Sequence, residues 1–164
     1  MDNVSHPLTL IMTIKNVESL RALAILLDPK FAAAAGNPIT ENRIREAMDK
    51  IGTVHFARFV IRPAQMELMI ITNYDNSFAA YISAFTSAIG EIFDQLLAHT
   101  VDGGSLIPVR EHEEEFLKYV QDHDASFDQE TQQPRPSYCA YPQLKVKDIL
   151  FLKKKADEGA APGN

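Results

Sequence analysis

The sequence predicts an α+β fold built on an antiparallel sheet. Three runs are rich in β-branched and aromatic residues, and the second and third are separated only by "RPAQ", in which Pro63 suits a turn position. Between and after these runs, apolar residues recur at spacings of three and four, as in amphipathic helices. The 164 residues, 46% hydrophobic and 23% charged, fit one globular domain. We expect that domain over residues 1–155 and a flexible tail over 156–164.

The first half of the chain predicts a strand, a two-piece helical crossover and a hairpin. The strand covers residues 8–15, and Asn16 then caps a helix that ends at "DP". After a break at "AAAAGNP", Thr40 caps a second helix that ends at Gly52. The hairpin strands cover residues 53–61 and 65–73.

The second half predicts helices and one more strand. The strongest helical pattern is an apolar stripe over residues 78–97, and "DNS" before it offers an N-cap. A further helix, "VREHEEEFLKYVQDHD", is followed by the polar loop "ASFDQETQQPRP", a short strand "SYCAYP" (137–142) and a last short helix near Val146. The resulting order is βαββαβ, with a split first helix and one extra helix before the last strand, which is the ferredoxin-like order.

The hairpin strands lack the alternation expected of a sheet with one wet face. Residues 54–61 and 66–71 are apolar at both parities, so both faces of the sheet look covered. Helices cover only one face in a ferredoxin-like monomer. We therefore expect a symmetric homodimer through the other sheet face, burying on the order of 2,000 Å². The alternative is that the inserted helix covers that face within the monomer.

The run "GTVHFARFVIRPAQMELMIITNYDNSFAAYISAF" resembles a segment of uncharacterised bacterial proteins of the dimeric α+β-barrel (ferredoxin-like) superfamily. The later "YCAYP…KVKDIL" resembles the closing strand and helix of those proteins. The resemblance implies a dimeric α+β barrel. At fold level the group is similar to cofactor-free monooxygenases, chlorite dismutases and dye-decolourising peroxidases, but none of their motifs aligns residue by residue with this chain. No catalytic residue and no cofactor is carried over.

His55 and Arg58 stand within the most strand-like run. Their separation of three places them on opposite faces of a regular strand, with His55 on the face of Phe59. His55 is either a hydrogen-bonded structural histidine or a pocket residue that transfers a proton or binds a ligand. Arg58 needs an anionic partner, either Glu67, Asp75 or an acid of the second subunit, or else an anionic ligand.

Aromatic residues of the sheet and the closing segment suggest a small-molecule pocket. In "TNYD", Asp75 at the start of the next helix is expected to act as its cap rather than leave an anion site there. The candidate pocket residues are His55, Arg58, Phe59, Tyr74, Tyr138 and Tyr141. We expect a protein that binds a small apolar or weakly anionic molecule. The alternative is a monooxygenase-like or haem peroxidase-like oxidoreductase with His55 as proton-transfer group or iron ligand.

Several other classes of function are disfavoured. A net charge of −6 opposes nucleic-acid binding, no apolar run reaches the ~20 residues of a membrane span, and the amino end lacks signal-peptide features. The single cysteine, Cys139, fits a reducing cytoplasm and has no partner for a disulfide. His112 and His123 lie ~16 Å apart along a helix, too far for one metal ion. We expect a cytoplasmic protein without a metal site.

Overall fold

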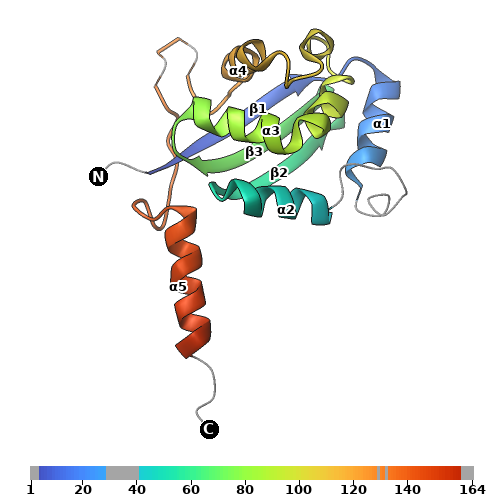
Figure 1. Cartoon of the computed structure of the whole chain (residues 1–164). Helices are drawn as coiled ribbons and strands as arrows, with labels where there is room; N and C mark the ends of the chain where they lie inside the picture. Colours follow the sequence, from blue (N-terminus) through green and yellow to red (C-terminus); the bar gives the residue numbers. More distant parts are fainter. Residues whose placement is uncertain (1–3, 29–40, 129, 132, 160–164) are drawn as a thin grey trace.

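The computed structural model describes residues 4–28, 41–128, 130–131 and 133–159, which form a mixed α+β fold around a three-stranded antiparallel sheet (Figure 1). The strands are β1 (Ser5–Thr13), β2 (Val54–Arg62) and β3 (Glu67–Asp75), in the spatial order β1-β3-β2. The helices are α1 (Val17–Leu27), α2 (Glu41–Ile51), α3 (Phe78–Leu97), α4 (Glu113–Asp122) and α5 (Val146–Gly159), with short 3₁₀ turns at Pro63–Gln65 and Gly103–Leu106. The α+β class and the hairpin predicted from the sequence are confirmed.

The crossover and the hairpin form from the local signals that predicted them. Asn16 caps α1 by accepting a hydrogen bond from the Ser19 backbone N–H at 2.8 Å. Pro63 begins the hairpin turn, and Met66 ends it in the left-handed region at φ 54°. β1 and β2 both pair antiparallel with β3 and are therefore parallel to each other. In the sequence, α1 and α2 form the connection between these two strands. The predicted break at "AAAAGNP" and the Thr40 cap lie outside the described residues.

One face of the sheet, here called the inner face, packs against α3 and α2 (Figure 1). The apolar stripe predicted for α3 is the side that it buries. The ion pair between Arg43 and Glu91 joins α2 to α3. The core of this layer comprises Leu8, Leu10, Met12, Leu68, Ile70 and Tyr74 of the sheet with Tyr81, Ile82, Phe85, Ile89, Ile92, Phe93, Leu96 and Leu97 of α3.

The opposite face, here called the open face, is apolar but only partly shielded. It comprises Thr9, Ile11, Phe56, Arg58, Val60, Met69, Ile71 and Asn73, all half-buried or exposed. The inserted helix α4 does not cover it, because Phe116 of α4 packs on Phe93 of α3, with ring centroids 5.2 Å apart. The alternative in which α4 shields the second face within the monomer is therefore wrong.

The fourth strand predicted at residues 137–142 does not form. An earlier segment already bonds the outer edge of β1: the Ile11 N–H donates to the His123 carbonyl at 3.1 Å, and the Ala125 N–H donates to the Thr9 carbonyl at 2.8 Å. The outer edge of β1 thus has its partners before the chain reaches residue 137. The aromatic run that follows is mostly exposed.

The last helix, α5, leaves the body of the protein and projects away from it (Figure 1). It continues to Gly159, past the domain end predicted at residue 155, and its residues from Leu150 to Gly159 are exposed. The remainder of the expected tail, residues 160–164, lies outside the described residues. None of the described helices is both long and apolar enough to cross a membrane.

Candidate functional site

A buried histidine–aspartate pair lies where β2 begins and β3 ends. The pairing of the two strands shifts between Val54 and Phe56, so a β-bulge places His55 outside the regular ladder. The His55 Nε2 lies 2.8 Å from Asp75 Oδ1, and the two side chains are only 6% and 2% exposed. The bulge thus aims an imidazole at the buried carboxylate that ends the neighbouring strand.

The same carboxylate also holds the start of α5. Asp75 Oδ2 accepts a hydrogen bond at 2.7 Å from the backbone N–H of Val146, the first residue of that helix. The expected role of Asp75 as the cap of α3 is wrong, because Ser77 caps α3 through the N–H of Ala80 at 3.3 Å. Asp75 instead satisfies an N–H at the amino end of α5, where a negative charge also interacts favourably with the helix dipole.

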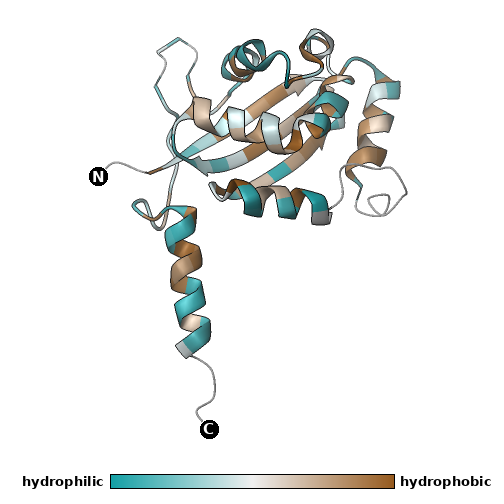
Figure 2. Ribbon diagram, in the orientation of Figure 1, coloured by the Kyte–Doolittle hydropathy of each residue, from teal (hydrophilic) through white to brown (hydrophobic). Residues whose placement is uncertain are grey.

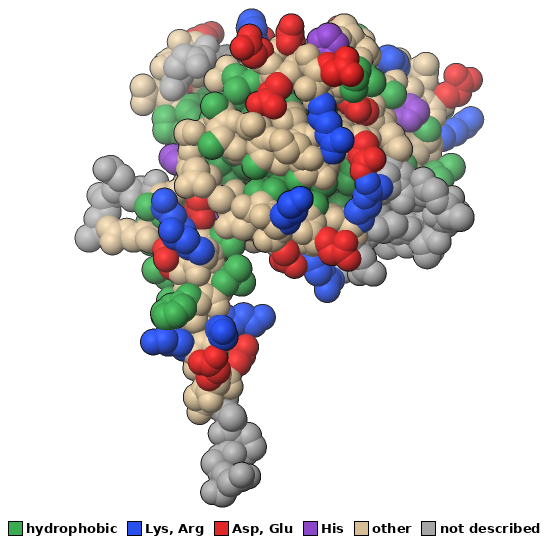
Figure 3. Space-filling model, viewed as in Figure 1, with side chains coloured by type: hydrophobic (Ala, Val, Ile, Leu, Met, Phe, Trp, Pro, Cys, Tyr) green, Lys and Arg blue, Asp and Glu red, His purple; other side chains and the backbone are tan. Residues whose placement is uncertain are grey.

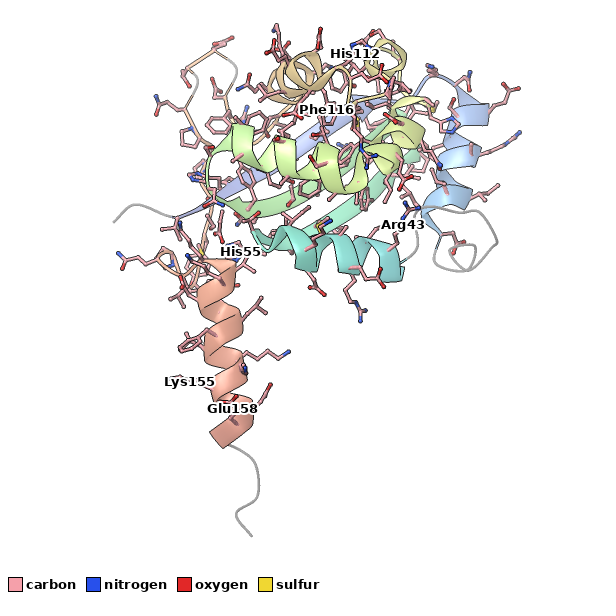
Figure 4. All side chains as sticks on the ribbon, viewed as in Figure 1. Arg43, His55, His112, Phe116, Lys155 and Glu158 are labelled. Carbon is pink, nitrogen blue, oxygen red and sulfur yellow. The ribbon has the colours of Figure 1, made fainter. Side chains whose placement is uncertain are left out.

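His55 opens on a pocket of about 290 Å³ between α2, the start of β2 and the first turns of α5. Figure 4 places His55 beside the start of α5. The His55 ring stacks against the Tyr141 ring with centroids 6.2 Å apart. The pocket is lined by Met48, Asp49, Gly52, Val54, His55, Tyr141, Val146, Ile149 and Leu150. The aliphatic and methionine side chains form one part of its wall, and Asp49, His55 and Tyr141 supply the polar part.

The pair gives this pocket a defined chemistry. When Nε2 donates to Asp75, Nδ1 of the neutral imidazole is an acceptor, and Nδ1 makes no hydrogen bond within the described part of the chain. His55 can therefore accept a hydrogen bond or a proton from a bound molecule. The buried carboxylate fixes the orientation of the ring.

The structure brings only two of the six candidate residues, His55 and Tyr141, to the pocket. Tyr138 is 90% exposed and lies away from it. Phe59 packs against the core from the inner face of β2. The aliphatic walls, which come from α2 and α5, were not predicted, although the apolar residues of both helices recur at helical spacing.

Tyr74 belongs to the core rather than to the pocket. It is 4% exposed, and its ring stacks on Tyr81 with centroids 3.9 Å apart. Burial, and to a lesser degree the negative charge of Asp124, raises the pKa of Tyr74 to about 12. Tyr74 therefore stays a neutral phenol in the core at physiological pH.

Arg58 lies on the open face, on the other side of the sheet from the inner layer. Its expected acidic partners are both engaged elsewhere, because Glu67 pairs with Arg62 at 3.0 Å and Asp75 pairs with His55. Those two pairings with Arg58 are wrong. Arg58 is exposed and forms no ion pair with another described residue.

The other histidines and the cysteine form no second centre in the described ranges. Figure 4 shows His112 at the far side of the molecule from His55, and the His123 ring stacks on Tyr119 at 4.1 Å. Cys139 accepts a weak hydrogen bond from Ser5 Oγ at 3.9 Å. Among the described residues, no group of three His, Cys, Asp or Glu side chains is arranged to hold a metal ion.

The partnership of His55 with Asp75 is the feature that sequence reasoning missed. Its signal was the hairpin, which brings residue 55 close to residue 75 once strand pairing and the bulge are known. Comparison of this chain with protein-family models, with curated proteins and with solved structures gives no match.

Proposed function

We propose that the protein binds a small, mostly apolar molecule with one hydroxyl or weakly acidic group in the pocket beside His55. The observation that carries this proposal is the buried His55–Asp75 pair opening on an aliphatic pocket of about 290 Å³. Ligand sites combine apolar walls with a few polar groups that fix orientation, and this volume is close to the lower end of their usual range.

The charges around the pocket narrow the class of ligand. Asp49 is an exposed carboxylate in the lining, and the Asp75 carboxylate lies directly behind His55. A strongly anionic molecule would meet both negative charges. A hydroxyl, or a carboxylic acid that shares its proton with His55, would form a hydrogen bond to Nδ1 while its apolar part contacts the aliphatic walls.

We further infer a ferredoxin-like architecture and a homodimer through the sheet face. The order β1-β3-β2, with a helical crossover between β1 and β2, supports the architecture, and the segment around Asp124 occupies the place next to β1 where a fourth strand would lie. The partly exposed apolar open face supports the dimer, since a monomer would leave Phe56 and its neighbours in water.

The same pair also favours an enzymatic alternative in which His55 transfers a proton. A carboxylate-oriented imidazole beside a substrate-sized pocket is the arrangement of a general base. Iron ligation by His55 has less support, because its Nε2 is already directed at Asp75 at 2.8 Å. Turnover of a bound molecule that is lost in His55→Gln, although weaker binding persists, would favour an enzyme over a binding protein, and an oxidised or reduced product would assign it to the oxidoreductase class.

Ligand-observed NMR with two matched probes, octanol and octanoate, tests the proposed site. We expect saturable binding of at least one probe, weakened about tenfold in His55→Gln through loss of the polar contact and abolished in Ile149→Trp, which fills the pocket. Tyr138→Ala, an exposed change outside the pocket, is the control and should bind like the wild type. Equal binding by the wild type and by Ile149→Trp would refute the site.

A further inference from the structure

The second turn of α5 is apolar on every side. At about 100° per residue, Ile149 and Leu150 lie towards the pocket that they line, while Phe151 and Leu152 point to the opposite side. Phe151 and Leu152 are 58% and 52% exposed. Figures 2 and 3 show this hydrophobic turn of α5 below the body of the protein, with basic side chains on the helix after it.

Such a helix needs a second surface to pack against. An isolated helix of 14 residues is marginal in water, and a helix with apolar residues around its circumference is normally enclosed. The described body reaches only the first turns of α5, and the labelled Lys155 and Glu158 in Figure 4 lie well away from it. Phe151 and Leu152 on the outward side of α5 are exposed, and the described contact over the Phe151 ring comes from Lys155 of the same helix. Asp148, at the start of this side, is half-buried and accepts a hydrogen bond from the Lys145 N–H at 3.0 Å.

We propose that the outward side of α5 packs on the open face of a second copy of this chain, and that the second copy returns the same contact. The proposal rests on the homodimer inferred above and names the element that makes it. In the described part of the chain, the open face and the outward side of α5 are two partly exposed apolar surfaces, and α5 projects away from its own sheet. A two-fold exchange covers both surfaces in both copies.

The acidic end of the outward side of α5 is complementary to the basic end of the open face. The outward side of α5 is acidic at Asp148, apolar in the middle and basic at Lys155, seven residues or about 10 Å further on. The open face runs from the unpaired Arg58, past Val60, to the level of Glu67 opposite Arg62, a separation of about 13 Å. Laid along β2 of the second copy, α5 brings Asp148 near Arg58 and Lys155 near the Arg62–Glu67 ion pair.

The buried area fits a stable assembly. The outward side of α5 offers roughly 300 Å², with Phe151 and Leu152 contributing about 100 Å² each, and the partly exposed residues of the open face offer a similar amount. A two-fold dimer contains two such contacts, each between one α5 and one open face. Together they bury on the order of 1,200 Å², which lies at the lower end of the range for specific protein interfaces.

The contact would make the ligand site depend on the second copy. The second copy would hold the outward side of α5. The inward side of the same helix forms part of the pocket wall through Ile149 and Leu150, and its first N–H donates to Asp75. Fixing α5 therefore fixes one wall of the pocket and the group that orients His55. The complete site forms only when both copies are present.

Disulfide trapping tests the contact directly. In a Cys139→Ser background, Val60→Cys and Leu152→Cys are purified separately, mixed in equal amounts and oxidised. We expect a covalent dimer from the mixture and little from either variant alone, because only α5 meeting the open face brings the two sulfurs together. Covalent dimers from Val60→Cys alone would indicate sheet-on-sheet packing and would overturn the proposal, as would the absence of any cross-link in the mixture.

Full-length charge variants give a second test by light scattering. Phe151→Glu combined with Leu152→Glu is expected to raise the dimer dissociation constant at least 100-fold, while Lys153→Glu, on the pocket-facing side of α5, should change it less than threefold. Neither outward residue lines the pocket, so wild-type binding of octanol by a purely monomeric protein would retain the proposed function and reject this contact. A dimer that shows no saturable probe binding would retain this contact and reject the proposed function.

Discussion

Replacing Asp75 by alanine tests the central role that the structure gives to this buried carboxylate. The change removes the acceptor of both the His55 ring and the first N–H of α5. A hydrogen bond to a buried charged group contributes about 1.5–3 kcal/mol, and loss of a helix cap costs about 1 kcal/mol. We therefore expect Asp75→Ala to lower the free energy of unfolding by about 3 kcal/mol, a large part of the stability of an ordinary domain.

Urea unfolding at pH 7, followed by circular dichroism, measures this effect. With a dependence of about 2 kcal/mol per molar urea, the midpoint should fall by about 1.5 M. Asp49→Ala is the matched control, because Asp49 is an exposed carboxylate in the lining of the same pocket, and its loss should change stability by less than about 0.5 kcal/mol.

A double-mutant cycle with His55→Ala separates the pair from its surroundings. If the contact at 2.8 Å couples the two side chains, the combined variant should lose less stability than the sum of the single variants, by about 1 kcal/mol or more. Additive losses, or a midpoint for Asp75→Ala within 0.3 M of the wild type, would refute the inference that this pair and the α5 contact hold the site together.

Two further predictions concern the loop after α3. Gly103→Ala should destabilise the fold by at least about 2 kcal/mol, because a Cβ there would stand 2.7 Å from the Leu97 carbonyl oxygen. In the control Gly104→Ala, the added Cβ would stand 3.8 Å from Lys15 Nζ, an ordinary van der Waals distance. Thermal unfolding of both variants compares them, and equal stability would contradict the clash. Burial, and secondarily the charge of Lys15, lowers the pKa of His99 below its usual 6.5, so the unfolded chain binds the proton more tightly and stability should fall as the pH drops below 6.5. His99→Gln should lose less stability than the wild type between pH 7 and pH 5 in urea titrations, and an identical loss would assign the effect to other groups.

The hairpin and α3 could be predicted from local sequence patterns, because their buried residues recur at the regular period of a strand or a helix. Alternate residues of β3, such as Leu68 and Ile70, are buried on the inner face, and the stripe of α3 packs on them. The apolar residues at the other parity, among them Met69 and Ile71, correctly indicated a second face that is not fully polar. What covers that face is a property of an assembly, which the pattern of a single strand does not specify.

The candidate site was harder to predict from the sequence, because its contacts join residues that are far apart in the chain. Parity treats β2 as regular, but the bulge removes His55 from the ladder and turns its ring towards Asp75, 20 residues away. Asp75 lies next to a helix start and therefore resembled a cap for that helix. Its actual N–H partner, Val146, is 71 residues further along the chain.

The closing segment shows why strand propensity alone misled. "SYCAYP" has aromatic and small residues typical of a short strand, but a strand also needs a free neighbour with unpaired N–H and C=O groups. The segment around Asp124 reaches β1 first, where the Asp124 side chain also accepts from the Thr9 N–H at 3.0 Å. With that part of the edge bonded, the later run reaches β1 only near its start, where the Val4 N–H donates to the Pro142 carbonyl at 2.8 Å.

The placement of α5 links the two proposals through one rigid element. A ligand in the pocket contacts Ile149 and Leu150, and the second copy would contact Phe151 and Leu152 on the opposite side of the same helical turn. Each event restricts the same helix, so whichever occurs first lowers the conformational entropy that the other must remove. Because such coupling is reciprocal, a ligand that favours the dimer must bind the dimer more tightly by the same factor. The Asp75 carboxylate is bonded to both the pocket histidine and the first N–H of α5, so the two proposed events would be coupled through it.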